Sequence, residues 1–185
     1  MNTRARHQIV TLMLAALLAG CSGEPDAPIP PPSPVAMTQE AVGHYCGMNL
    51  YEHIGPKGQI LLRGQNDPVW FTTIREVFAY TLLPEEPKTI AAIYVQDMGR
   101  AGQDGNPPAD AWINARTAHF VIESSAVGGM GAPDALPFAQ LEDAHTFASQ
   151  HGGRVVDFKN MPEDYVLRAP DLSPRTPPAP VGASS

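Results

Sequence analysis

The sequence has few cysteines, little positive charge and no apolar run long enough to cross a membrane. Only two of its 185 residues are cysteine, so a framework of several disulfides is excluded. The apolar run Ile9 to Leu18 is too short to span a bilayer as a helix. Basic residues number 12 against 19 acidic ones, and no basic patch stands out. An acidic chain without such a patch is a poor candidate for binding nucleic acid.

The common enzyme signatures are also missing. The chain contains no Gly-x-Ser-x-Gly, no phosphate-binding loop, no paired zinc-type cysteines and no His-Glu-x-x-His. We therefore expect no enzymatic activity. One alternative stays open, because a single thiol beside a histidine can act as a nucleophile if its pKa is lowered. That alternative is a thiol-dependent envelope enzyme that uses Cys46.

The N-terminus predicts a targeting segment. Arg4 and Arg6 precede the apolar run, which ends in Leu18-Ala19-Gly20-Cys21, a sequence that resembles a bacterial lipobox. In that class the chain is cut before the cysteine, which then carries acyl chains such as palmitate. Several acyl chains anchor a protein stably, where a single chain is marginal. Ser22 follows and no Asp is present to retain the protein at the inner membrane, so we expect the periplasmic face of the outer membrane. An ordinary signal peptide with a chance cysteine is the alternative.

The composition divides the chain into five segments. Residues 22–37 form a proline-rich tether, and the chain is again rich in Pro, Ala and Ser after residue 168, which is typical of disorder. Loss of the leader removes two basic residues and no acidic one, so the formal net charge falls from −7 to −9. The predicted segments are a cleaved signal peptide (1–20), a lipidated cysteine with tether (21–37), two folded units (38–105 and 106–168) and a disordered tail (169–185).

The first folded unit predicts two strands, a helix and a third strand. A turn over 55–58 precedes the first strand. The helix begins at a capping box, in which the Thr73 hydroxyl and the Glu76 carboxylate satisfy free amides, and it ends at Pro84. The predicted strands cover 59–63, 69–72 and 90–96.

The second half repeats this plan. We expect strands over 112–113, 118–122 and 154–158, and a helix over 141–150 that Gly152 or Gly153 caps. Two apolar series match at one constant offset, which suggests duplication: Phe71, Ile74, Val77 and Tyr80 against Phe138, Leu141, Ala144 and Phe147. The predicted class is α+β, with two duplicated strand–strand–helix–strand units and small antiparallel or mixed sheets, each covered by one helix.

Cys46 and Met48 are the strongest candidate metal ligands. If Cys21 is lipidated, Cys46 is the only free thiol, and an unpaired thiol in an oxidising compartment is a liability unless it is buried or used. Thiolate and thioether are soft ligands that select Cu(I). On a strand the two side chains share a face, and on a loop Gly47 lets the backbone bend so that both sulfurs turn inward. A buried cysteine beside a core methionine is the alternative.

A third ligand is open. His44 lies two residues before the thiol, and Met130 lies in a glycine-rich loop with little else to pack against, so both are candidates. Met98 ranks below them and His53, five residues past Met48, is a more distant possibility. The remaining methionines and histidines show no ligand spacing: Met37, Met161, His119, His145 and His151.

These residues together resemble the NosL family, the accessory lipoproteins of nitrous oxide reductase maturation. The likeness covers nearly all of the core in order. It runs through the lipobox, Tyr45-Cys46-Gly47-Met48, Gly55-Pro56-Lys57-Gly58-Gln59, Ala92-Ile93-Tyr94-Val95-Gln96-Asp97-Met98-Gly99, Trp112-Ile113-Asn114-Ala115, Gly129-Met130-Gly131-Ala132-Pro133 and His151-Gly152-Gly153.

The resemblance implies a periplasm-facing chaperone that carries one Cu(I) ion as transferable cargo for denitrification. The Cys-x-Met ligands of the family map onto Cys46 and Met48 here. The implied partners are the ABC-type membrane transporter complex of the maturation system and, through it, the apo-reductase. The copper would serve the copper centres of the reductase. A structural adaptor of the same complex that binds no metal is the remaining alternative.

Overall fold

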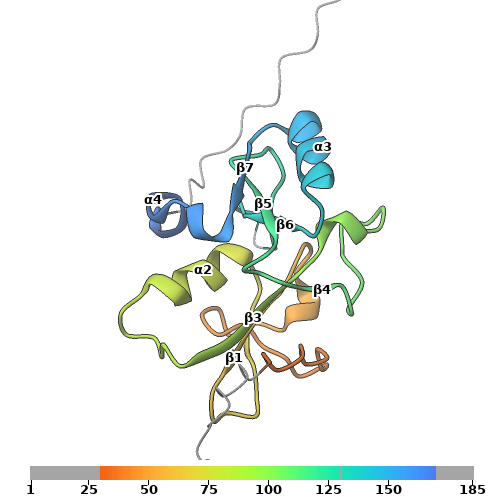
Figure 1. Cartoon of the computed structure of the whole chain (residues 1–185). Helices are drawn as coiled ribbons and strands as arrows, with labels where there is room; N and C mark the ends of the chain where they lie inside the picture. Colours follow the sequence, from red (N-terminus) through yellow and green to blue (C-terminus); the bar gives the residue numbers. More distant parts are fainter. Residues whose placement is uncertain (1–29, 130, 170–185) are drawn as a thin grey trace, which may run out of the picture. The chain divides into compact units, whose positions relative to one another are not determined.

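The computed structural model describes residues 30–129 and 131–169, and the described elements all lie in the compact unit Pro32–Ser185 (Figure 1). In chain order they are β1 (Gly58–Leu62), β2 (Val69–Phe71), α2 (Ile74–Leu82), β3 (Ile90–Gln96), β4 (Trp112–Asn114), β5 (His119–Ile122), β6 (Leu136–Phe138), α3 (Leu141–His151), β7 (Arg154–Asp157) and α4 (Glu163–Leu167). Within these residues no helix has the length and apolarity that a bilayer span needs. The predicted signal peptide, Cys21 and all but the first residue of the predicted tail lie outside the described residues.

The first sheet has the strand order β2-β1-β3-β4, with antiparallel pairing throughout. Its helix α2 begins where the sequence predicts, because the Thr73 side chain accepts from the Glu76 amide and the Glu76 side chain accepts from the Thr73 amide. Every residue of β1 is buried. The predicted capping box and the order strand–strand–helix–strand are therefore confirmed.

The second sheet has the order β6-β5-β7 and is also antiparallel. In both units the first strand lies between the second and the third, so the two units share connectivity and strand order. The predicted offset also holds in space: Phe71 and Phe138 end β2 and β6, and Ile74 and Leu141 begin α2 and α3. The protein is an α+β fold built from two strand–strand–helix–strand units.

Three local expectations are wrong. Trp112 and Ile113 form a strand, but β4 pairs with β3 of the first sheet instead of opening the second. The second strand of the second unit is β6. The sequence does not predict this strand, because Pro137 lies within it. Proline is tolerated there because β6 is an edge strand. The predicted final strand ends at Asp157, and a further short helix, α4, follows it.

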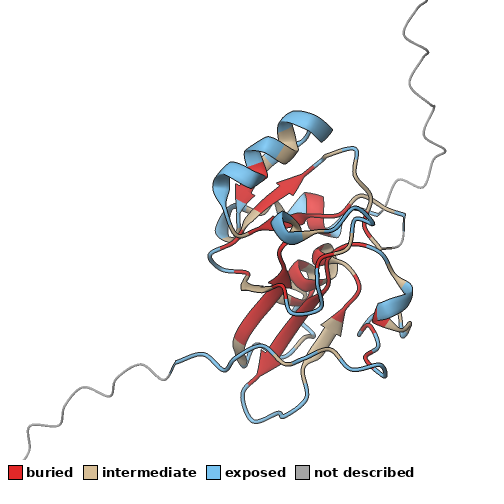
Figure 2. Ribbon diagram, turned by 90° about the vertical axis from the view of Figure 1, so that its right-hand side faces the viewer, coloured by how far each residue is buried: buried red, intermediate tan, exposed pale blue. Residues whose placement is uncertain are grey.

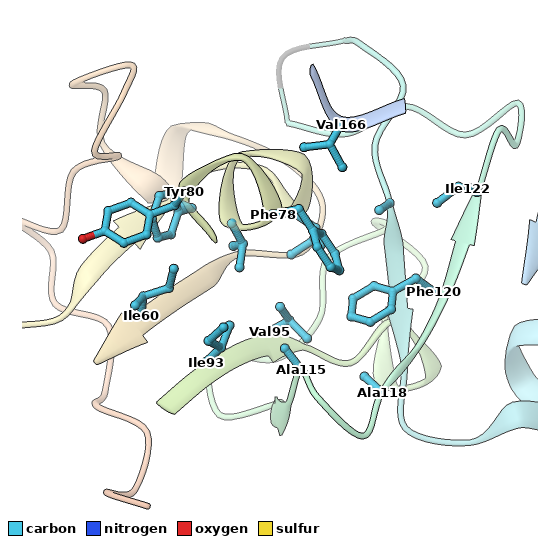
Figure 3. Packing of buried hydrophobic residues seen from close by; sticks show 14 of the residues in the cluster. Ile60, Phe78, Tyr80, Ile93, Val95, Ala115, Ala118, Phe120, Ile122 and Val166 are labelled. Atoms are coloured by element: carbon cyan, nitrogen blue, oxygen red, sulfur yellow. The ribbon is translucent and has the colours of Figure 1, made fainter. Parts of the chain in front are cut away.

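The largest hydrophobic cluster joins the two units. Phe78 of α2 packs edge to face on Phe120 of β5, with ring centroids 5.0 Å apart (Figure 3). Both rings also pack near Phe158. Burial of one such ring contributes about 1.5–3 kcal/mol. β1 is buried along its length and β3 from Ala92 to Gln96, whereas α3 is largely exposed (Figure 2). The shared core fixes the first sheet, which carries the candidate site, against the second.

Candidate metal centre

Cys46 and Met48 lie on a short closed turn that precedes the first sheet. An antiparallel bridge between Val42 and Asn49 closes the turn, and the Gly43 amide donates to the Met48 carbonyl at 2.9 Å. Gly47 has a φ of 65°, a backbone conformation that favours glycine. Of the two geometries considered for this stretch, the structure therefore adopts the bent loop.

The turn is seated on β2 and on the residue that follows it. The His44 amide donates to the Trp70 carbonyl at 2.7 Å, and Cys46 Sγ lies 3.5 Å from Thr72 Oγ1. The sulfur packs directly over Gly43, where an added Cβ would stand 2.6 Å from Sγ. Cys46 is half-buried and forms no disulfide. The thiol thus lies between the Gly43 backbone, which leaves room for it, and the Thr72 hydroxyl.

Thr72 connects the thiol to the start of α2. Its hydroxyl donates to Glu76 Oε2 at 3.0 Å, and the same oxygen accepts from the amides of Thr72 and Thr73 at 3.1 Å. A hydroxyl has one hydrogen, so while Glu76 receives it the Cys46 S–H is the donor toward Thr72. If the sulfur is deprotonated, the Thr72 hydroxyl can rotate and donate to it instead.

The His44 ring contacts a carboxylate and an aromatic cluster. Its Nε2 lies 3.1 Å from Glu86 Oε1, which also accepts from the Tyr45 hydroxyl at 2.9 Å. The ring packs edge to face on Phe71 and Tyr80. Burial, and next the hydrogen bond to Glu86, raise the pKa of Tyr45 above its ordinary value. With Nε2 engaged, His44 could bind a metal in this conformation only through Nδ1.

A second loop, closed by a bridge between Val127 and Pro133, approaches the Cys46 turn at Thr72. Gly129 packs so closely that an added Cβ would lie 3.0 Å from the Thr72 carbonyl oxygen and 3.1 Å from the Ile54 carbonyl oxygen. Thr72 therefore faces Cys46 with its hydroxyl and Gly129 with its carbonyl. The candidate ligand Met130, which follows Gly129 in sequence, lies outside the described residues. The neighbouring Gly129 thus lies against Thr72, the residue on which the Cys46 turn packs.

Asp134 fastens the second loop to α2. Its carboxylate accepts from the amides of Ile74, Arg75 and Ala135 at 2.8–3.0 Å. Burial raises its pKa to about 6, although these three hydrogen bonds act in the opposite direction. Lys57 is also buried, and burial lowers its pKa to about 8 against the attraction of Asp134.

His53 is more closely tied to the site than the sequence indicates. Its Nδ1 lies 2.9 Å from the Gly129 carbonyl oxygen. A carbonyl only accepts, so Nδ1 carries the hydrogen and, in the neutral ring, Nε2 is a bare acceptor. Nε2 is buried and has no hydrogen-bond partner among the described residues. The sequence offers His53 only as a distant candidate, and its contact with Gly129 could not be predicted because the two residues lie 76 positions apart in the chain.

The lower-ranked candidates have other surroundings. Met98 packs against the smaller hydrophobic cluster of the second unit, and Met161 packs against the main one. His119 pairs with Asp157 at 3.1 Å, and the His151 ring stacks on Phe147. Across residues 30–129 and 131–169, no three His, Cys, Asp or Glu side chains come together as a metal site.

Comparisons with known proteins identify the family of this chain. The NosL family model matches residues 34–166. The copper-binding lipoprotein NosL of Achromobacter cycloclastes is 42% identical over 168 residues, which is 90% of this chain and 85% of the relative. The protein of the same name from Stutzerimonas stutzeri is 34% identical over 165 residues, or 89% and 84% of the two chains. The crystal structure of the copper chaperone NosL from Shewanella denitrificans matches with a TM-score of 0.67 at 32% identity, over 72% of this chain and 98% of that one. The chain therefore belongs to the NosL family.

Proposed function

We propose that this protein is a copper chaperone of the bacterial cell envelope and carries one Cu(I) ion as cargo. The relatives described above are a copper chaperone and copper-binding lipoproteins. The observation that carries the proposal is the closed turn that holds Cys46 and Met48, with the thiol half-buried and unpaired against Thr72. A thiolate and a thioether on one turn suit a soft monovalent ion.

The exposure of the turn suits a carrier that must release its cargo. Cys46 and Met48 are both half-buried, so an incoming ligand can reach the ion without unfolding of the sheet. A third donor would complete the low coordination number that Cu(I) accepts. We propose His44, through Nδ1, and Met130 as the two candidates for it.

We further propose that the copper is destined for the copper centres of nitrous oxide reductase. Delivery would pass through the ABC-type transporter complex of the maturation system to the apo-reductase. The mature chain would be anchored through acyl chains on Cys21 and face the periplasm, with the outer membrane favoured. Globomycin, which blocks lipoprotein signal peptidase, should make the precursor accumulate. Sucrose-gradient fractionation of untreated cells would assign the mature protein to the inner or the outer membrane.

The binding step is tested on the mature chain in detergent, by competition with a chromophoric Cu(I) chelator under reducing, anaerobic conditions. Cys46→Ser should weaken Cu(I) binding by about a thousandfold or more, and Met48→Ala by about ten- to a hundredfold. Each factor of ten in affinity corresponds to about 1.4 kcal/mol of binding free energy. Met161→Ala removes a thioether that packs on the core and should leave the affinity unchanged. Wild-type affinity in both ligand variants would overturn the site assignment.

The third ligand is tested by X-ray absorption spectroscopy of the copper-loaded chain. The spectrum counts sulfur against nitrogen neighbours. A nitrogen neighbour that disappears in His44→Phe assigns His44, and a shell of sulfur alone that loses one neighbour in Met130→Ala assigns Met130. A spectrum that neither substitution changes would exclude both candidates.

A further inference from the structure

The exposed apolar side chains of the protein gather beside the candidate copper site. In the described residues, six large hydrophobic side chains are exposed, and four of them fall within residues 42–54: Val42, Tyr45, Tyr51 and Ile54, at 41–55% exposure. The other two, Leu141 and Leu167, are far along the chain at 47% and 52%. Exposed apolar residues gathered in one place commonly mark a site of protein interaction.

The four residues surround the turn that holds the thiol. Val42 forms the bridge that closes the turn, and Tyr45 lies within it. Tyr51 and Ile54 follow directly, and the Ile54 carbonyl lies against Gly129 of the second loop. We call Val42, Tyr45, Tyr51 and Ile54 the apolar rim.

Both tyrosines present their rings rather than their hydroxyl groups. The Tyr45 hydroxyl donates to Glu86 at 2.9 Å, and the Tyr51 hydroxyl donates to the Met37 carbonyl at 3.1 Å. Each ring is thus held at both ends, and little conformational freedom remains to be lost on binding. Rigid aromatic rings of this kind are the residues that contribute most at protein interfaces.

The stretch of chain that carries the rim has exposed charge of one sign. Glu40 and Glu52 are exposed in the same stretch of chain. Between Cys21 and Pro56 there is no lysine or arginine, and the first cation beyond, Lys57, is buried. A partner that covers the rim would therefore meet apolar surface bordered by negative charge, which complements an apolar patch bordered by lysine or arginine.

We infer that the apolar rim is the docking surface for the protein that accepts the copper, and that the docking face of this acceptor is apolar with a basic border. The inference rests on the proposed function, because only transfer of an ion requires a partner at this turn. A ligand from the acceptor must come within bonding distance of the ion while it is still held. The surface around the turn is then necessarily the contact surface, and its apolar side chains supply the affinity.

The test compares substitutions in the rim with substitutions at the two exposed leucines elsewhere. Ile54→Ser and Tyr51→Ser remove apolar surface from the rim, add no charge and do not touch Cys46 or Met48. Leu167→Ser and Leu141→Ser remove apolar side chains of similar exposure elsewhere. Each copper-loaded mature chain is titrated against the purified transporter complex in detergent, at low and at high salt.

We expect the rim variants to bind the complex at least tenfold more weakly and the leucine variants to bind as the wild type does. Wild-type binding should also weaken as salt is raised. Equal binding by all variants, or equal weakening in rim and leucine variants, would overturn the inference. So would light scattering that shows a wild-type dimer which the rim variants disrupt, since the rim would then join two copies of this chain.

Chelator competition on the same variants separates this inference from the proposed function. Rim variants that hold Cu(I) with wild-type affinity but fail to bind the complex support the docking surface. A wild-type chain that holds no Cu(I) refutes the proposed function, and the docking inference is overturned with it. Normal copper binding with normal docking in every variant refutes the docking surface alone.

Discussion

The two strand–strand–helix–strand units share their strand order but hold their helices differently. Four side chains of α2 are buried: Ile74, Val77, Phe78 and Tyr80. In α3, as the structure describes it, only Ala144 is buried, and Leu141, the counterpart of Ile74, is 47% exposed. The same pattern of apolar residues therefore forms a buried helix in one unit and a half-exposed helix in the other. The two units thus share strand order and connectivity and differ in how their helices pack.

The starts of the two helices differ in the same direction. Helix α2 has the Thr73 capping box, whereas Gln140 before α3 makes no capping hydrogen bond with its side chain. At the position of Thr72 the second unit has Ala139, whose amide donates to Asp97 Oδ1 at 3.0 Å. The polar junction that seats the thiol therefore exists only in the first unit. The comparison teaches that the candidate site depends on the strand-to-helix junction as much as on its two sulfur residues.

The largest expected effect concerns Asp134, which the second unit contributes to the start of α2. Burial raises its pKa from 3.8 to about 6, so the folded state binds its proton more tightly than the unfolded state does. Its contribution to stability is present in full below about pH 4 and is lost as pH rises through 6. The loss is about 3 kcal/mol at most, at 1.36 kcal/mol per pKa unit.

Urea unfolding of the wild type and of Asp134→Asn between pH 4 and 7 measures this effect. The unfolding free energy of the wild type should fall relative to that of the variant as pH rises. Glu76 also faces Asp134 and raises its pKa, and Lys57 carries the opposing charge. Parallel curves for the two proteins would show that the α2 junction is not held by a titrating carboxylate.

The next effect concerns the close packing of Gly43 under the sulfur. An alanine there would place its Cβ 2.6 Å from Cys46 Sγ, so Gly43→Ala should displace the sulfur and weaken Cu(I) binding by about tenfold, or 1.4 kcal/mol. Gly64 is the matched control. It has a φ of 78° and open space around it, so Gly64→Ala should cost about 1 kcal/mol of stability through strain and leave the copper affinity unchanged. Equal copper affinity in both variants would contradict the close packing of Cys46 Sγ on Gly43.

The smallest effect exchanges the helix starts. Thr73→Ala removes the cap of α2 and should lower the unfolding free energy by about 1 kcal/mol. Gln140→Ser would supply α3 with a capping side chain three residues before Asp143. This substitution should raise the unfolding free energy by about 1 kcal/mol. Urea unfolding of both variants measures the change. If the serine stabilises nothing, the exposure of α3 has a cause other than its uncapped start.

Local signals predicted the parts of the fold that local chemistry determines. The capping box, Pro84 and the glycine after α3 marked helix ends, and the matched apolar series revealed the duplication. The helix boundaries agree with those signals to within about two residues. The strand β6 was missed because Pro137 disguises an edge strand as a loop, and β4 was given to the wrong sheet because pairing is a long-range property.

The same division applies to the candidate site. The soft pair of Cys46 and Met48 is visible in the sequence because both members lie on one short turn. Gly43 and Thr72 carry no such signal, and His53 carries only a weak one, because each acts through a neighbour that folding brings close. The roles of Cys46, Met48 and Met130 as ligands stay predictions. The sequence thus indicates candidate ligands, whereas only the structure shows what surrounds them.

The hydrogen-bonded group of Cys46, Thr72 and Glu76 has a consequence for repeated use. Under the proposed function, the sulfur would exchange its proton for an ion, one bond rotation in Thr72 would redirect the hydroxyl, and Glu76 would keep the amides of Thr72 and Thr73. The first turn of α2 would then keep these hydrogen bonds whether or not the sulfur holds an ion. Such a carrier would load and release its cargo over many cycles without local unfolding.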